Sequence, residues 1–410
     1  MCNYLKFYRW ILPVVAGLLA NPVHARTWTS ADGAKTFVGE LRGYDPERGM
    51  VSVTLLNGKR ISFNQSRLSA ADIAFLKSSG ASSTGSSPVR GAPLPEVLPD
   101  PDGKEADMSK PVQVYVLLGQ SNMLGFGKPN VLQGIAAEKY PYLVNDAGEW
   151  TTRKDVRNVR VMCSGNSPAK DHINNWMTIE GNIGPEIGIG HYLGHVTDAP
   201  VMVLKSCIGN RSLGWDLLPP GTKPWEHGGK MQPGYRGTPN DPGGDTGGDM
   251  SKGWYAGAQY DGDVAAAKKV LENLDKYYPG AKEYEVVGFF WWQGDKDMRN
   301  AAHYQSYEKN LIQLIKSLRN DFEAPGARFV SASLGQTEEG SQRGDGVILD
   351  AMKSVAGSDD PELQGKVGFV YTNPLSKGGS SSGHYGGNPE TYMNVGEAMG
   401  KAMVELLRGR

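Results

Sequence analysis

The sequence predicts an α/β protein: a three-layer sandwich around a mostly parallel, doubly wound sheet, preceded by a small all-β barrel. Two observations carry this prediction. After Pro111, short and nearly continuous apolar runs alternate with helical patterns to the end of the chain, as expected when parallel strands are buried on both faces. Before that point, short β-like runs are separated by turn signals.

The apolar runs after Pro111 predict the strands of one sheet. They cover residues 112–118, 201–206, 286–292, 329–334 and 367–371. Helical periodicity predicts helices at 185–195, 263–278, 303–322 and 391–407. In a doubly wound sheet, ligands bind outside the carboxyl ends of the strands. We therefore expect the functional residues directly after these apolar runs.

The N-terminal residues 1–25 have the pattern of a cleaved signal peptide. Lys6 and Arg9 precede an apolar run, and the small residues Val23 and Ala25 fit signal peptidase cleavage near Ala25. The apolar run is too short to cross a bilayer of about 30 Å, so no stable membrane insertion is expected. The prediction is a secreted or periplasmic protein, which places Cys163 and Cys207 in an oxidising compartment and leaves their pairing open.

Residues 26–77 form the predicted small barrel, and residues 78–110 the flexible linker that follows it. Strands are expected at 36–41, 50–56 and 60–63, with a hairpin signal at Asn57-Gly58 and a capped helix at 68–76. The linker is rich in Ser, Gly, Pro and Asp. Arg26-Thr27-Trp28-Thr29, Phe37-x-Gly39 and Leu68-Ser69 resemble the SLA-homology type of SH3-like domain. That resemblance implies an adhesive or structural role and leaves the partner of this domain unknown.

Charge and cysteine content exclude two classes of function. The chain has 43 Lys and Arg against 44 Asp and Glu, so it has no net positive field for a nucleic acid. Three cysteines without a CxxC pair offer no zinc site. The 54 glycines are more than usual and are concentrated in the expected loops of residues 111–410.

Polar residues follow the predicted strands at the expected edge of the sheet. Ser121 comes just beyond the first strand, where a hydroxyl is lifted to the rim of the sheet. Gly209 follows the second strand and offers a backbone N–H to an oxyanion, and Gln293 follows the third beside two carboxylates. His384 lies in a glycine-rich loop before the last helix. A serine, a base and anion donors are the parts of a nucleophilic hydrolase.

These residues resemble the sialate O-acetylesterase-like branch of the SGNH hydrolases over residues 111–407. The resemblance rests on five motifs: Gly119-Gln120-Ser121-Asn122-Met123, Ile183-Gly184-Pro185-Glu186, Gly209 to Leu213, Trp292-Gln293-Gly294-Asp295, and His384-Tyr385. It implies a serine esterase without cofactor or metal that removes acetyl groups from an acetylated oligo- or polysaccharide. It also implies that Ser121 is the nucleophile and His384 the general base, with the Ser121 N–H, Gly209 and Gln293 as oxyanion donors.

The acid partner of the histidine departs from the usual pattern of that family. Many SGNH enzymes have Asp three residues before the histidine, whereas this chain has Ser381. Related esterases use the carboxylate of a Gln-Gly-Glu motif, and Asp295 occupies that position, with Asp297 as the alternative acid. The motif at Gly209 also departs from that pattern, because the family commonly has a second glycine at the position of Asn210.

Neighbours of the motif residues are candidates for binding the substrate. They are Gln120, Asn122, Glu186, Arg211, Trp292 and Tyr385, with Trp215, Trp225 and Trp254 as faces for sugar rings.

Three other functions are alternatives to a carbohydrate esterase. A catalytically weakened glycan-binding protein on the same fold is the main alternative. His191 and His195 have the spacing of a metalloprotease helix, although Tyr192 stands where that motif needs Glu. A lipid esterase would require an apolar lid, whereas the insertion at 219–250 is hydrophilic. The oligomeric state, the sugar and the acetyl position stay open.

Overall fold

The computed structural model describes residues 25–46, 49–55, 60–78, 94–101, 103–243 and 254–409. The predicted signal peptide lies outside these residues except for Ala25. The chain divides into two units, Met1–Gly85 and Ser86–Arg410, and each is considered by itself.

The N-terminal unit is an antiparallel sheet followed by a helix. Its strands pair in chain order and its core is built around Trp28, whose indole nitrogen donates to the carbonyl of Gly39 at 3.0 Å. The three strands expected from the sequence are present, together with an additional first strand. The resemblance to an SH3-like domain stays a prediction. The elements are β1 (Arg26–Thr29), β2 (Thr36–Asp45), β3 (Met50–Leu55), β4 (Arg60–Asn64), η1 (Gln65–Arg67) and α1 (Ala70–Ser78).

The second unit is built on a seven-stranded sheet in the order β13-β12-β11-β5-β8-β6-β7. All neighbours are parallel except the edge pair β6 and β7. The chain adds strands on one side of β5 and then, after β8, on the other side, so the strand order reverses at β5. The strands are β5 (Val112–Gly119), β6 (Arg153–Met162), β7 (Lys170–Met177), β8 (Val201–Ser206), β11 (Tyr284–Trp292), β12 (Arg328–Ala332) and β13 (Val367–Val370). A separate hairpin contains β9 (Trp225–His227) and β10 (Lys230–Gln232).

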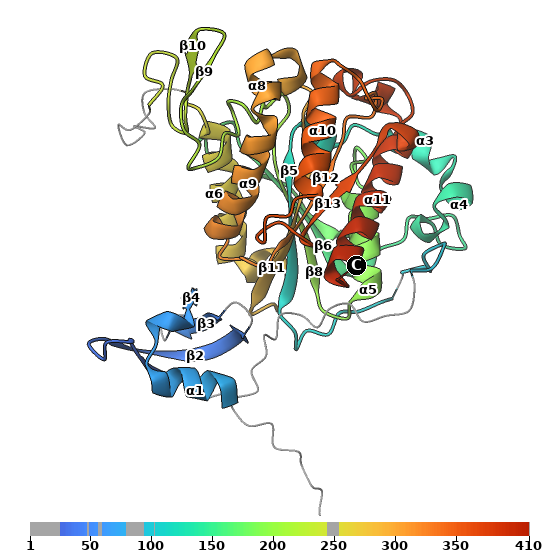
Figure 1. Cartoon of the computed structure of the whole chain (residues 1–410). Coiled ribbons are helices and arrows are strands. Elements are labelled where there is room, and N and C mark those ends of the chain that lie inside the picture. Colours follow the sequence, from blue (N-terminus) through green and yellow to red (C-terminus); the bar gives the residue numbers. More distant parts are fainter. Residues whose placement is uncertain are drawn as a thin grey trace, which may run out of the picture. The chain divides into compact units, whose positions relative to one another are not determined.

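Helices cover both faces of this sheet and make three layers (Figure 1). One face packs on α6 (Ala258–Glu272), α9 (Tyr307–Asp321) and α10 (Gly344–Ala356), and the other on α5 (Glu186–Val196) and α11 (Pro389–Leu407). Strand β5 is buried along its whole length between the two cores. The three-layer, doubly wound fold predicted from the sequence is therefore confirmed. The shorter helices are α2 (Ser121–Leu124), α3 (Pro129–Gln133), α4 (Ala136–Lys139), η2 (Pro141–Leu143), α7 (Leu274–Tyr277), η4 (Asp297–Arg299), α8 (Ala301–Gln305), η5 (Asn373–Leu375) and η6 (Ser381–Gly387).

Two strands of the large sheet, β6 and β7, escaped the sequence analysis. Strand β7 has mostly exposed or half-buried side chains and so forms no apolar run, whereas several of the buried side chains of β6 are charged. In β6, Arg153 is 2% exposed and forms a two-pronged ion pair with Asp155. Arg157 is also buried and donates to the carbonyl of Tyr277 at 2.8 Å. Charged side chains are rarely buried, so a search for apolar runs does not reveal a strand whose buried charges are paired.

The last part of the predicted linker is packed on the second unit rather than free. Leu98 is 3% exposed and belongs to the core under α5 and α11. The ammonium group of Lys104 donates to the carbonyl of Thr197, just after α5, at 3.0 Å. Apolar burial and this hydrogen bond attach residues 94–101 and 103–110 to the second unit. In the described part of the chain, no helix has the length and hydropathy that crossing a membrane requires.

Leu98→Ala tests whether this segment belongs to the folded unit. Removing a buried leucine side chain is expected to lower the free energy of unfolding by about 2–5 kcal/mol. The neighbouring Val97 is 55% exposed, so Val97→Ala should change it by less than about 0.5 kcal/mol. Denaturant titration of both variants measures the difference, and equal stabilities would show that the segment is a free linker.

Candidate active site

Ser121 lies at the carboxyl end of the central strand. Strand β5 ends at Gly119, Gln120 follows, and Ser121 is the first residue of α2. Gly119 allows this turn, because its φ of 148° disfavours side chains and a Cβ there would lie 2.5 Å from the carbonyl oxygen of Trp292. Ser121 is 8% exposed and lies just beyond the carboxyl end of β5.

Gly209, after β8, lies directly beside Ser121. A Cβ built on Gly209 would be 3.6 Å from the Cβ of Ser121. The N–H groups of Gly209 and Ser121 donate to no residue within the described ranges, so both are available to an oxyanion. Asn210 has a φ of 57°, a left-handed conformation that glycine adopts easily and asparagine tolerates. The departure from a second glycine therefore leaves the shape of the loop intact.

Arg211, predicted to bind substrate, folds back on its own loop. Its Nη1 donates to the carbonyls of Gly209 at 3.2 Å and Asn210 at 3.1 Å. Its Nε donates to Gln259 at 3.0 Å, and the guanidinium lies 5.0 Å from the ring centre of Trp254. Most of its donors are used within the protein, so Arg211 braces the loop that carries Gly209.

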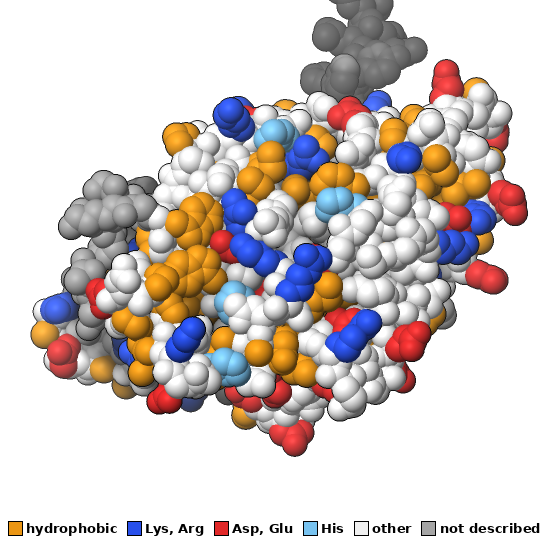
Figure 2. Space-filling model, turned by 90° about the horizontal axis from the view of Figure 1, so that it is seen from above, with side chains coloured by type: hydrophobic (Ala, Val, Ile, Leu, Met, Phe, Trp, Pro, Cys, Tyr) orange, Lys and Arg blue, Asp and Glu red, His pale blue; other side chains and the backbone are white. Residues whose placement is uncertain are grey.

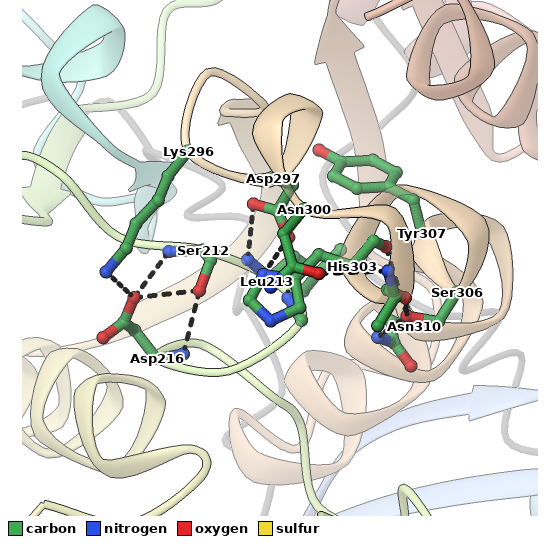
Figure 3. Close-up of polar contacts among 12 residues, drawn as sticks. Ser212, Leu213, Asp216, Lys296, Asp297, Asn300, His303, Ser306, Tyr307 and Asn310 are labelled. Carbon is green, nitrogen blue, oxygen red and sulfur yellow. Dashed lines mark hydrogen bonds and ion pairs between the residues drawn. The ribbon is translucent and has the colours of Figure 1, made fainter. Parts of the chain in front are cut away.

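Asp297 anchors the far end of the same loop (Figure 3). Its carboxylate accepts from the N–H groups of Leu213 at 2.9 Å and Gly214 at 2.8 Å, and from Gln293 at 2.5 Å. Burial raises the pKa of Asp297 to about 6 against the lowering effect of these bonds. His303 lies 3.8 Å away, and burial lowers its pKa to about 4, so it is a neutral neighbour. The geometry thus argues against Asp297 as the alternative acid beside His384.

Gln293 is fully buried behind the site, and its amide is already occupied. Its Nε2 lies 2.8 Å from the carbonyl of Arg211, 3.1 Å from Gln120 Oε1 and 2.5 Å from Asp297. Its Oε1 accepts from the hydroxyl of Tyr307 at 2.9 Å. An amide nitrogen has two N–H groups. In this arrangement Gln293 has none left for an oxyanion, contrary to the role expected from the resemblance.

His384 sits in a strained loop against the segment that follows α2. It has a φ of 50°, and Tyr385, Gly386 and Gly387 are also left-handed. Its imidazole stacks on the ring of Phe126 with a centroid distance of 4.1 Å and an angle of 12°. Both Ser121 and His384 belong to the part of the chain that the structure describes, and their side chains are not hydrogen-bonded to each other. Catalytic bonds often tighten only when substrate binds.

Asp295 accepts hydrogen bonds from the loop that carries His384. Its Oδ1 accepts from the hydroxyls of Ser381 at 2.7 Å and Ser382 at 2.6 Å. Arg299 donates to Ser382 at 2.7 Å and approaches the other carboxylate oxygen at 3.3 Å. Neither Asp295 nor Asp297 is hydrogen-bonded to the imidazole in the described structure. Of the two acids, Asp295 is the one bonded to the histidine loop.

Five of the six predicted substrate-binding residues prove to be buried supports of the site. Tyr385, for example, stacks on Trp292 at 5.9 Å, and its hydroxyl accepts from the N–H of Gly335 at 3.1 Å. Each of these residues is at most 2% exposed, so it lies in the interior and not on the surface of the site. The five are Gln120, Asn122, Glu186, Trp292 and Tyr385.

The structure also shows the surroundings of the two cysteines and of the histidines on α5. Cys163 and Cys207 are both buried and free. His191 is buried on α5 with its ring 4.8 Å from that of Tyr142, and burial lowers its pKa. Within the described ranges, no group of three His, Cys, Asp or Glu residues could hold a metal ion.

Three supporting residues were missed by the sequence analysis. Phe126 gave no signal, since an isolated aromatic residue after a motif is usually core. Lys205 did give one, as a lysine inside an apolar strand, and it forms a buried ion pair with Glu186. Lys296 binds the carboxylate of Asp216 at 2.7 Å beside the Gly209 loop (Figure 3). A charge within or beside an apolar run is the pattern that would have found the last two.

The face seen from above carries a mixed polar surface (Figure 2). Lys and Arg side chains and histidines gather near its centre, acidic side chains lie mainly toward the margin, and an apolar patch occupies one side. This surface contains many groups that could hydrogen-bond a hydroxylated substrate.

Comparison with known proteins supports the resemblance to carbohydrate acetylesterases. Residues 244–405 match the family model described as carbohydrate esterase, sialic acid-specific acetylesterase. The match covers less than half of the chain. It includes Gln293, Asp295 and His384 but neither Ser121 nor Gly209. No curated protein matches the chain.

Several solved structures resemble this one in part. A protein from Arabidopsis thaliana has a TM-score of 0.42 and 14% identity, over 72% of this chain and 99% of its own. A carbohydrate acetylesterase from Xanthomonas citri has a TM-score of 0.41 and 12% identity, over 73% and 57%. The protein NanS has a TM-score of 0.34 and 14% identity, over 64% and 78%.

Asp297→Asn tests the buried anchor of the Gly209 loop through the pH dependence of stability. Because the pKa of Asp297 is raised from 3.8 to about 6, the folded protein binds more protons than the unfolded chain between these values. The free energy of unfolding therefore decreases as pH rises through this window, by on the order of 3 kcal/mol from this group. In Asp297→Asn that decrease should be absent.

The measurement is denaturant unfolding at pH 4.5 and pH 7 for the wild type and the variant. The exposed Asp146→Asn is the control and should follow the wild type. If Asp297→Asn shows the same pH slope as the wild type, Asp297 does not titrate in this window.

Proposed function

We propose that this protein is a serine esterase that removes O-acetyl groups from carbohydrates. The observation that carries the proposal is the position of Ser121 at the reversal point of the sheet, with Gly209 beside it. The His384 loop, which falls in the segment matched by the esterase family model, packs against the chain just after α2. These are the parts that acyl transfer requires.

The acylation step uses groups of this chain alone. His384 takes the proton from the Ser121 hydroxyl while its oxygen attacks the acetyl carbonyl carbon. The carbonyl oxygen becomes an oxyanion, which the N–H groups of Ser121 and Gly209 stabilise. When the tetrahedral intermediate collapses, the bond to the sugar oxygen breaks and His384 gives its proton to the leaving alcohol.

The second step regenerates the enzyme. Water attacks the acetyl-serine, His384 takes a proton from it, and the same two donors stabilise the second oxyanion. Acetate leaves and Ser121 regains its proton. Asp295 is the carboxylate partner of this cycle, and it acts on His384 through the two serines that precede it. No step requires a cofactor.

The proposed substrate is an acetylated oligo- or polysaccharide outside the cytoplasm. The family match and the polar surface near the strand ends support a hydroxylated substrate. The signal peptide predicted for residues 1–25 supports secretion or export to the periplasm.

A second candidate is a glycan-binding protein on the same fold. The observation that favours it is the lack of a hydrogen bond between His384 and either Asp295 or Asp297 in the described structure. An imidazole without a carboxylate on its ring is a weaker base for serine activation, although the rest of the site retains part of the rate enhancement.

Ser121→Ala decides between the two. If Ser121 is the nucleophile, hydrolysis of an aryl acetate should fall by at least about 10⁴-fold. Acetate release from acetylated xylan, pectin and sialosides should fall with it, and the exposed Ser109→Ala should remain as active as the wild type. Chromogenic assays and acetate detection measure both.

Two outcomes would contradict the esterase proposal. Equal rates for the wild type and Ser121→Ala would show that another group carries the reaction. A wild type that releases no acetate but binds an acetylated glycan, measured by calorimetry, would establish the binding protein instead.

The role of Asp295 is tested by moving the carboxylate. Asp295→Asn should lower kcat about 10–100-fold, because it weakens the hold on Ser381 and Ser382 without removing a ring contact. Ser381→Asp alone should also lower it, since two carboxylates would then face each other. The double variant places one carboxylate three residues before His384 and should recover activity above either single variant.

A double-mutant cycle on aryl acetate hydrolysis measures this coupling. Additive losses would mean that Asp295 and position 381 act independently. Full activity in Asp295→Asn would remove Asp295 from the mechanism.

A further inference from the structure

A buried ion pair lies directly beneath the helix that begins with Ser121. Lys205 is 0% exposed and Glu186 2% exposed, and their side chains are bonded to each other. The ammonium group of Lys205 also donates to the carbonyl oxygen of Leu124 at 2.9 Å. Leu124 is the last residue of α2, so the pair is joined by one hydrogen bond to the short helix that Ser121 begins.

The surroundings of this pair are apolar. In strand β8, Val201 and Val203 face the core under α5 and α11, and alternation places Lys205 on the same face. Leu117 and Ile187 belong to this core as well. Placing two charges in such a core costs several kcal/mol per ion before their attraction is counted.

The backbone around the pair is shaped to receive it. A Cβ on Gly184 would lie 2.2 Å from the Glu186 carboxylate, 2.8 Å from Lys205 Nζ and 2.9 Å from the Leu124 oxygen, so only glycine fits. Ile183 and Gly127 exchange two backbone hydrogen bonds, of 2.8 and 2.9 Å. The segment that leads into α5 is thereby fastened to the segment that follows α2.

We propose that Glu186 and Lys205 are positioning residues that fix Ser121 through the carbonyl of Leu124. A buried ion pair is poor evidence for stability, because apolar side chains of similar volume often serve as well or better. Its hydrogen bond to Leu124 is what an apolar pair cannot supply. Because α2 has only four residues, it lacks the length to hold its own direction and depends on this bond. The inference rests on the proposed role of Ser121 as nucleophile.

The test separates stability from position. Lys205→Met leaves Glu186 buried without a partner and should lower Tm by roughly 5–10 °C. The double variant Lys205→Met/Glu186→Leu removes both charges and should recover most of that loss. Its kcat for an aryl acetate should nevertheless stay about 100-fold below the wild type with KM changed less than about threefold, because Ser121 is misplaced.

Hydrogen–deuterium exchange gives a second measurement that does not depend on catalysis. In the double variant, peptides covering residues 119–127 should exchange faster than in the wild type. The matched control is Arg153→Met/Asp155→Leu, which replaces the buried pair of β6. It should leave both kcat and exchange at 119–127 unchanged.

The outcomes distinguish the two proposals. Wild-type kcat and exchange in the double variant would overturn the positioning role. If the wild type releases acetate from no substrate, the esterase proposal fails, and faster exchange at 119–127 in the double variant still establishes that the pair holds α2.

Discussion

The buried bond between Gln293 and Asp297 holds together the loops that follow three adjacent strands. Gln293 directly follows β11, and its side chain is hydrogen-bonded to Gln120, beyond β5, and to the carbonyl of Arg211, beyond β8. Asp297 receives two backbone N–H groups from the latter loop. Two side chains that are 0% exposed, Gln293 and Asp297, therefore link the loops that carry Ser121 and Gly209. Such a network is specific in geometry because each buried polar group must keep its partners.

The strand order explains why this meeting point exists. Since β5 lies between β8 and β11 and all three are parallel, their carboxyl ends meet at one edge of the sheet. The polar groups there are shielded from water, where unpaired donors and charges are costly and paired ones are strong. The raised pKa of Asp297 is the sign of that cost. Despite this cost of burial, the paired groups form a fixed frame around Ser121 and Gly209.

Sequence patterns identify five strands of the large sheet and the position of Ser121 just beyond one of them, but not which neighbouring side chains are buried. The apolar runs at β5, β8, β11, β12 and β13 are visible because both faces of those strands are buried. β6 is hidden because Arg153 and Asp155 satisfy each other inside the core. Gln120 and Trp292 lie at strand ends as Ser121 does, yet the turn after β5 leaves Ser121 8% exposed while these two are at most 1% exposed. That turn depends on tertiary contacts, such as the approach of Gly119 to the Trp292 carbonyl.

Each segment that bears a proposed catalytic group is held by charged side chains from another part of the chain. Glu186 acts with Lys205 on the end of α2, Asp297 holds the Gly209 loop, and Asp295 holds the two serines before His384. These segments have little regular structure of their own: a four-residue helix, a loop with a left-handed asparagine, and a run of left-handed residues from His384 to Gly387. Regular hydrogen bonding cannot fix such backbone, whereas a carboxylate that accepts several donors can. On this reasoning Asp295, in the loop after β11, supplies to the His384 loop a carboxylate that the resemblance would place three residues before the histidine, where this chain has Ser381.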